Sequence, residues 1–135
     1  SACLVGSEMC IRDRNMPSVS RVIMGHAWRI KLNPHHFDGH LVMQDYFSAV
    51  IYFIFLATGR VKAAFVKANW WDIAAGMAIC KALGMGLYDY DSREELLEFN
   101  EAFFHANCRL KKMQICGFAE DFERVKAVSA GVIND

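Results

Sequence analysis

The carboxylate of Asp72 is the side chain whose surroundings in this sequence point most directly to chemistry. It lies in the segment WDIAAG, residues 71–76, where a loop is expected to turn into a helix. An aspartate in that position can simply be the N-cap, because its oxygens accept backbone N–H bonds and complement the helix dipole. The same carboxylate can also bind a hard cation such as Mg²⁺, which prefers oxygen ligands. The two roles are compatible, so the neighbouring sequence has to show whether a metal role applies.

The elements that must position this carboxylate alternate between strand and helix. Residues 45–58 are apolar on nearly all sides and contain no helix breaker, which predicts a buried helix. Gly59 is typical of its C-terminal cap, since glycine tolerates the left-handed conformation. Residues 61–67 and 87–91 have the composition of strands, and they enclose a second predicted helix over residues 72–83.

The remaining segments fit the same alternating order. Strands are expected over residues 28–32 and 112–116, whereas residues 19–24 could be helix or strand and residues 92–104 a short helix or an irregular segment. Residues 118–133 predict an amphipathic helix, because apolar side chains recur there at helical spacing. These side chains are Phe118, Phe122, Val125, Val128 and Val132. The order of elements predicts an α/β layered sandwich with a mixed sheet flanked by helices.

Composition excludes several classes of protein. The chain has 135 residues, of which 54% are hydrophobic, so one domain with a packed core is expected. Lys plus Arg and Asp plus Glu each total 15, which gives no electrostatic footprint for nucleic acid or an anionic membrane. The most apolar stretch, residues 46–57, is shorter than the roughly 20 residues that span a bilayer. Five cysteines without a C-x-x-C pair indicate reduced thiols, so we expect a cytoplasmic protein.

The first residues differ in character from the rest of the chain. Residues 3–14, CLVGSEMCIRDR, resemble the in-frame translation of a transposase adapter used in sequencing libraries. The alternative is an ordinary N-terminal loop and strand. We expect residues 1–14 to be a non-native segment and residues 15–135 to be the domain, with an N-terminal domain missing upstream.

An ordered set of segments resembles a known family signature. LATGRVKAAF at residues 56–65 is followed by WDIAAG at residues 71–76, then KALG at residues 81–84 and LYD at residues 87–89. This set resembles the second signature of the inositol monophosphatase family. The resemblance covers residues 45–91 well and the rest only by the order of elements.

The resemblance implies a fold, an activity and site residues. The chain would be the C-terminal half of an inositol monophosphatase-like fold, and the full protein a Mg²⁺-dependent phosphomonoesterase acting on inositol phosphate or a related small sugar or polyol phosphate. The family hydrolyses such esters with two metal ions. Asp72 would be a metal ligand that also lies beside the substrate hydroxyls, while Ser48 and Ala49 would begin the helix next to the substrate. A homodimer is expected for the full-length protein.

Departures from the family pattern weaken the expectation of activity. Phe47 stands where the family has glycine, and residues 82–85, ALGM, replace the usual Glu-Ala-Gly-Gly. The family's first signature begins with Asp-Pro, a pair that occurs nowhere in this chain. One carboxylate cannot hold two octahedral Mg²⁺ ions, so we expect the chain alone to be inactive. The alternatives are a non-catalytic α/β module, or a relative that hydrolyses nucleotide bisphosphate or fructose bisphosphate.

Two other groups of acids and histidines are candidates for metal binding. His35, His36 and His40 lie with Asp38 in a Pro- and Gly-containing loop, where solvated side chains are the expected arrangement. Asp89 and Asp91, at the end of a predicted strand, could lie near a cation, but exposed carboxylates are the expected arrangement.

Overall fold

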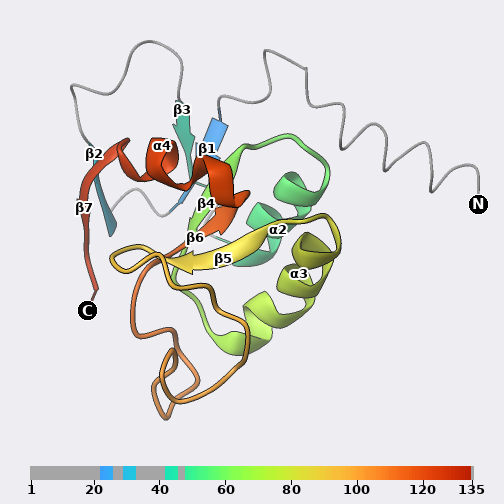
Figure 1. Ribbon diagram of the computed structural model, residues 1–135, viewed down its shortest axis with the longest axis vertical. Coiled ribbons are helices and arrows are strands. Elements are labelled where there is room, and N and C mark those ends of the chain that lie inside the picture. Colours follow the sequence, from blue (N-terminus) through green and yellow to red (C-terminus); the bar gives the residue numbers. More distant parts are fainter. Residues whose placement is uncertain (1–21, 26–28, 33–41, 46–47, 135) are drawn as a thin grey trace, which may run out of the picture.

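A five-stranded mixed sheet forms the centre of the molecule (Figure 1). The structure, a computed structural model, describes residues 22–25, 29–32, 42–45 and 48–134. The strands follow the spatial order β3-β1-β4-β6-β5. Their bounds are β1 Val22–Met24, β3 Val42–Gln44, β4 Ala63–Val66, β5 Gly86–Asp89 and β6 Gln114–Gly117.

Strand direction places several carboxyl ends at one edge of this sheet. β1 pairs in parallel with both β3 and β4, whereas β6 is antiparallel to both β4 and β5. Hence β1, β3, β4 and β5 all run the same way and end at the same edge. In open α/β sheets this edge is where ligands bind.

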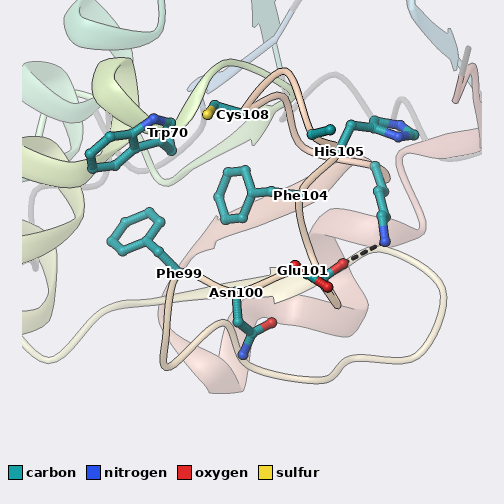
Figure 2. A pocket seen from close by; sticks show the side chains of 9 residues that line it. Trp70, Phe99, Asn100, Glu101, Phe104, His105 and Cys108 are labelled. Carbon is teal, nitrogen blue, oxygen red and sulfur yellow. Dashed lines mark hydrogen bonds between the residues drawn. The ribbon is translucent and has the colours of Figure 1, made fainter.

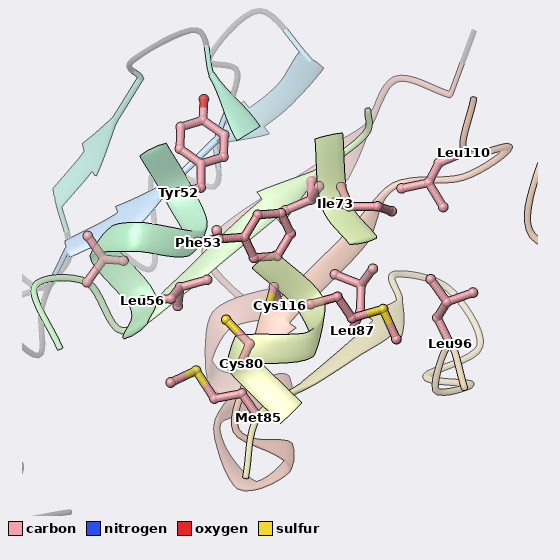
Figure 3. Packing of buried hydrophobic residues seen from close by; sticks show 14 of the residues in the cluster. Tyr52, Phe53, Leu56, Ile73, Cys80, Met85, Leu87, Leu96, Leu110 and Cys116 are labelled. Carbon is pink, nitrogen blue, oxygen red and sulfur yellow. The ribbon is translucent and has the colours of Figure 1, made fainter. Parts of the chain in front are cut away.

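Helices α2 (Ala49–Ala57) and α3 (Trp70–Ala82) lie side by side and cover one face of the sheet (Figure 1). Their buried side chains pack with inward-facing residues of β4, β5 and β6 in a single cluster (Figure 3). The cluster includes Tyr52, Phe53 and Leu56 from α2, Ile73, Met77 and Cys80 from α3, and Val66, Leu87 and Cys116 from the strands. Helix α2 depends on this burial, since it has no acidic residue in its first turn and no basic residue in its last.

The other face of the sheet is covered by C-terminal elements together with β2. These are a 3₁₀ turn at Ala119–Asp121, helix α4 (Phe122–Lys126) and a two-stranded sheet of β2 (Ile30–Leu32) with β7 (Ser129–Val132). A second cluster joins them to the sheet, with Phe65 of β4 and Ile115 of β6 at its centre. The predicted layered α/β sandwich with a mixed sheet flanked by helices is confirmed.

Most predicted elements are present, with shifted ends. Helix α2 lies within the predicted range, and Gly59 after it has φ 73°, as expected for a C-terminal glycine. Residues 19–24, left open between helix and strand, contain strand β1. Residues 92–104 form no helix, which agrees with the irregular alternative. Within the described residues, no helix is long and apolar enough to cross a membrane.

The single amphipathic helix predicted over residues 118–133 is wrong. The helical part stops at Lys126, and Ser129–Val132 forms a strand antiparallel to β2. Val128, Val132 and Ile133 are β-branched and Gly131 has φ 154°, so the end of this segment has poor helix propensity. Pairing with β2 then favours a strand, because it gives hydrogen-bond partners to backbone groups that would lack them at a frayed helix end. The apolar spacing correctly indicated burial, since Phe122, Val125 and Val128 are all buried. However, Val128 lies beyond the end of the helix, so the spacing did not indicate a continuous helix.

Several predictions fall outside the described residues. They concern the adapter-like residues 3–14, Phe47, and the group formed by His35, His36, Asp38 and His40.

Candidate functional site

A pocket of about 360 Å³ lies where α2 and α3 begin, beside the carboxyl end of β4. Its lining comes from three parts of the chain that are far apart in sequence. The lining residues are Ser48, Ala49, Val50, Lys67, Ala68, Asn69, Asp72 and Arg109. All three site residues named from the sequence, Ser48, Ala49 and Asp72, therefore line one pocket.

Arg109 reaches the pocket through an extension of the sheet. Beyond β4, the Leu110 N–H donates to the Ala68 carbonyl at 3.1 Å, and the Trp70 N–H donates to the Cys108 carbonyl at 2.9 Å. Asn69 and Arg109 form an antiparallel bridge between these two bonds. The segment before β6 is thereby fixed against the start of α3, with Arg109 on the pocket side.

Asp72 is not the N-cap that its position in the sequence suggested. Helix α3 begins two residues earlier than predicted, so Asn69 is the N-cap and Asp72 is the third helical residue. The Asp72 N–H donates to the Asn69 carbonyl at 3.0 Å, which tightens the first turn. Its half-buried carboxylate complements the helix dipole and makes no hydrogen bond or ion pair with any part of the chain that the structure describes. The carboxylate is therefore available to a ligand.

Neither helix is capped by its N-cap side chain at this pocket. Ser48 and Asn69 are residue types that usually accept a bond from the first turn, yet neither makes a side-chain cap hydrogen bond. In α3 the first-turn N–H groups of Trp70 and Asp72 donate instead to the backbone carbonyls of Cys108 and Asn69. Two helix N-termini therefore line one pocket, and the side chains of their N-cap residues make no capping hydrogen bond.

Two cations in the pocket were not identified from the sequence. Lys67 directly follows β4 and is only 3% exposed, and Arg109 is partly buried. Lys67 could have been found, because it ends the strand predicted over residues 61–67 and so falls at the edge where ligands bind. Arg109 gave no local signal, since it lies in an irregular segment placed by long-range pairing.

The described residues alone do not fit a magnesium centre. One carboxylate, from Asp72, lines the pocket together with two cations. No group of three or more His, Cys, Asp or Glu side chains that could hold a metal occurs within the described ranges. Mg²⁺ needs near-octahedral oxygen ligands and often two carboxylates, so further ligands would have to come from elsewhere.

Asp89 is buried, which corrects the expectation of an exposed strand-end carboxylate. It is 5% exposed. Its Oδ1 accepts bonds from the Asp91 N–H at 3.0 Å, the Ser92 N–H at 2.9 Å and the Ser92 hydroxyl at 3.1 Å. This carboxylate organises the turn after β5 and is not part of the pocket.

Asp89→Ala is expected to lower the free energy of unfolding by about 2 kcal/mol, because four donors to a charged acceptor, including the Gln114 side-chain amide at 3.4 Å, lose their partner. Asp91→Ala is the matched control, since Asp91 is exposed and its carboxylate lies 3.8 Å from the Lys112 ammonium in a solvated pair. Its expected change is within about 0.5 kcal/mol. Urea unfolding followed by circular dichroism measures both, and equal effects would contradict the assigned role of Asp89.

A second, aromatic hollow of about 690 Å³ lies at the start of α3, with Trp70 in its lining (Figure 2). Trp70, Phe99 and Phe104 surround it, with ring centroids 6.1 Å apart for Trp70 and Phe99 and 5.5 Å apart for Phe99 and Phe104. Cys108 also lines it, next to Arg109 of the first pocket. These ring contacts hold the irregular segment that carries Arg109 against the start of α3.

Solved structures that resemble this chain in fold include inositol monophosphatase-type proteins. The extragenic suppressor protein suhB from Bartonella henselae aligns with TM-score 0.55 and 14% identity, over 83% of this chain and 42% of its own. An inositol monophosphatase–fructose 1,6-bisphosphatase aligns with TM-score 0.62 and 19% identity, over 84% and 44%. The inositol monophosphatase II called SaIMPase-II, from Staphylococcus aureus and solved with inositol monophosphate bound, aligns with TM-score 0.52 and 17% identity, over 83% and 43%.

These likenesses define the class of fold. The chain has the mixed α/β fold of inositol monophosphatase family members, and the resemblance seen in the sequence is confirmed at the level of fold. It spans about two fifths of the length of those solved structures. No protein-family profile matches the chain, and no curated protein sequence matches it.

Proposed function

We propose that this chain is the substrate-holding, C-terminal portion of a Mg²⁺-dependent phosphomonoesterase that acts on inositol phosphate or a related small sugar or polyol phosphate. The observation that carries the proposal is that Ser48, Ala49 and Asp72, which lie in two separate parts of the family signature, line one pocket. Related folds support a small phosphorylated ligand, since SaIMPase-II has been solved with inositol monophosphate and with 2′AMP. The full protein would be a cytoplasmic homodimer.

Each pocket residue has a defined part in this proposal. The Asp72 carboxylate accepts hydrogen bonds from substrate hydroxyls, and it offers one oxygen ligand to a magnesium ion that the described residues cannot hold alone. Ser48 supplies a hydroxyl that is free of capping, and Ala49 leaves room beside the first turn of α2. The chain would thus bind and orient the substrate, whereas the chemistry would depend on ligands from outside the described residues.

The isolated chain is expected to bind inositol 1-phosphate without hydrolysing it, because a single carboxylate gives no magnesium centre. Amide NMR shifts should concentrate at residues 48–50 and 67–72, and a phosphate-release assay should read zero with or without Mg²⁺. Asp72→Ala should weaken this binding by about tenfold, the loss of a charge-assisted hydrogen bond to the ligand.

The outcomes separate two parts of the proposal. Shifts spread over other surfaces, or none at saturating ligand, would rule out the pocket as the substrate site. Magnesium-dependent release of phosphate that Asp72→Ala abolishes would show instead that the chain holds its own metal.

A non-catalytic module is the second candidate function. The observation in its favour is that Lys67 and Arg109 line the pocket beside one carboxylate among the lining residues that the structure describes, a charge balance unfavourable to a metal cation. A relative that hydrolyses fructose bisphosphate or a nucleotide bisphosphate is a variant of the first candidate. A substrate panel on the full-length protein would distinguish these cases, since a non-catalytic module hydrolyses none of the esters.

A further inference from the structure

Two opposite charges line the pocket at the starts of α2 and α3 without pairing with each other. Neither the Arg109 guanidinium nor the Asp72 carboxylate makes a hydrogen bond, ion pair or ring contact within the part of the chain that the structure describes. Lys67 also lines the pocket, but it already has an interaction partner in the chain, so its charge is not counted as open to a ligand. One open cation and one open anion fit a ligand that offers both an anionic group and hydrogen-bond donors.

The backbone of Arg109 is held on both sides, so its side chain starts from a fixed position. Its N–H donates to the Asn107 side-chain oxygen at 3.2 Å, and its carbonyl accepts the His105 N–H at 2.9 Å. The bridge to Asn69 ties this residue to the start of α3, the helix that carries Asp72. Two joined segments therefore present the guanidinium and the carboxylate to one pocket, as in a preorganised binding site.

We propose that Arg109 binds a carboxylate of the substrate, and that the ester held here is the phosphate of a sugar acid. A carboxylate matches the planar guanidinium fork with two parallel hydrogen bonds. The hydroxyl groups of the same molecule donate to the Asp72 carboxylate. The volume of about 360 Å³ is enough for a sugar acid of hexose size.

Charge balance favours a carboxylate over a phosphate group beside Arg109. A phosphate group would bring up to about two negative charges close to the Asp72 carboxylate, whereas a carboxylate brings a single charge that the guanidinium offsets. A neutral polyol would displace water from Arg109 and leave the guanidinium without an anionic partner. This inference rests on the proposed function, because it takes the pocket as the site of the polyol part of the substrate.

Amide NMR titrations with gluconate and with glucitol test the carboxylate, because these two polyols differ only at one terminal carbon. At matched ionic strength, gluconate is expected to bind the chain about tenfold more tightly than glucitol, with shifts at residues 67–72 and 107–110. Arg109→Gln should remove this preference. Arg124→Gln is the matched control, since Arg124 is exposed on α4, which packs on the other face of the sheet.

Two further measurements test the hydroxyl groups of the ligand. Asp72→Ala should weaken the binding of both gluconate and glucitol, because their hydroxyls lose an acceptor, and should leave the preference for gluconate in place. Acetate, which has a carboxylate and no hydroxyl, should bind more weakly than gluconate. Acetate that binds as tightly as gluconate, or an Asp72→Ala variant that binds both polyols as the wild type does, would indicate a bare anion site and refute the sugar acid.

The remaining outcomes separate this inference from the proposed function. Equal affinity for gluconate and glucitol would overturn the inference, as would no binding of gluconate, a preference that Arg109→Gln leaves unchanged, or one that Arg124→Gln removes as well. If inositol 1-phosphate shifts the pocket residues while gluconate binds no better than glucitol, the inference fails and the proposed function stands. If gluconate keeps its advantage while inositol 1-phosphate shifts nothing, the proposed function fails and the carboxylate site stands.

Discussion

Gly76→Ala is expected to destabilise the protein by about 2–3 kcal/mol, although the same change in an exposed helix interior stabilises by about 1 kcal/mol. A Cβ atom at Gly76 would overlap Phe53 Cγ and would lie 2.6 Å from Phe53 Cβ. Rotation of the ring cannot relieve the second contact, because Phe53 Cβ is fixed to the α2 backbone. Phe53 is also 3% exposed and projects from α2 toward α3 (Figure 3). The two helices would have to separate, and urea unfolding measures the cost.

A double-mutant cycle with Phe53→Ala isolates the contact. Removing the ring leaves room for α2 to adjust, so Gly76→Ala should cost less in that background than in the wild type. Ala75→Gly, at an exposed neighbouring position, serves as the control for helix propensity and should cost about 1 kcal/mol. If Gly76→Ala stabilises the wild-type chain, α2 and α3 do not pack at this glycine.

The same contact explains why α2 and α3 were predictable from the sequence. Residues 45–58 and 72–83 are apolar, contain no proline, and end at glycines, so local pattern and tertiary burial favour the same structure. Gly76 was noticed only as part of a family motif. Its physical reason, close approach of a neighbouring helix, depends on Phe53, which lies in a different segment.

The helix predicted over residues 118–133 was wrong because local pattern and tertiary contacts favour different structures there. Apolar spacing after Phe118 is helical, but the alternative partner for residues 129–132 is β2, about a hundred residues earlier in the chain. The Ile133 N–H donates to the Arg29 carbonyl at 2.8 Å, and the Tyr90 and Ser129 hydroxyls lie 2.6 Å apart. Neither contact can be predicted from the residues next to it in the sequence, and both favour an extended strand over a helix.

The residues of the candidate site also fall into two groups, those predictable from local sequence and those placed by long-range contacts. Ser48, Ala49 and Asp72 were named because their segments resemble a signature, and Lys67 stood at a predictable strand end. Arg109 required knowledge of the bridge to Asn69. The sequence therefore suggested a cation site from one carboxylate, while the charges that surround this carboxylate come from residues that only folding brings near it.

The isolated chain is expected to self-associate through the outer sides of α2 and α3. Large apolar side chains there are more than half exposed, with Ile54 at 52%, Trp71 at 57% and Ile79 at 55%. Both helices turn their other side to the sheet, so these residues have no cover from the described residues. In a two-fold symmetric contact, these residues of both copies would lie in the interface and be removed from water. Sedimentation velocity should show dimers or larger species whose fraction rises with concentration.

Ile54→Lys with Ile79→Lys should convert these species to monomer while changing the free energy of unfolding by less than about 0.5 kcal/mol, since both side chains are solvent-exposed. Neither residue lines the pocket, so binding of inositol 1-phosphate should be retained. Leu97→Lys is the matched control, because Leu97 is 64% exposed but lies in the irregular segment after β5, away from both helices. A wild-type chain that sediments as a monomer at all concentrations would refute the prediction. If Leu97→Lys converts the assemblies to monomer to the same extent as the double variant, net charge rather than the surface of the two helices controls association.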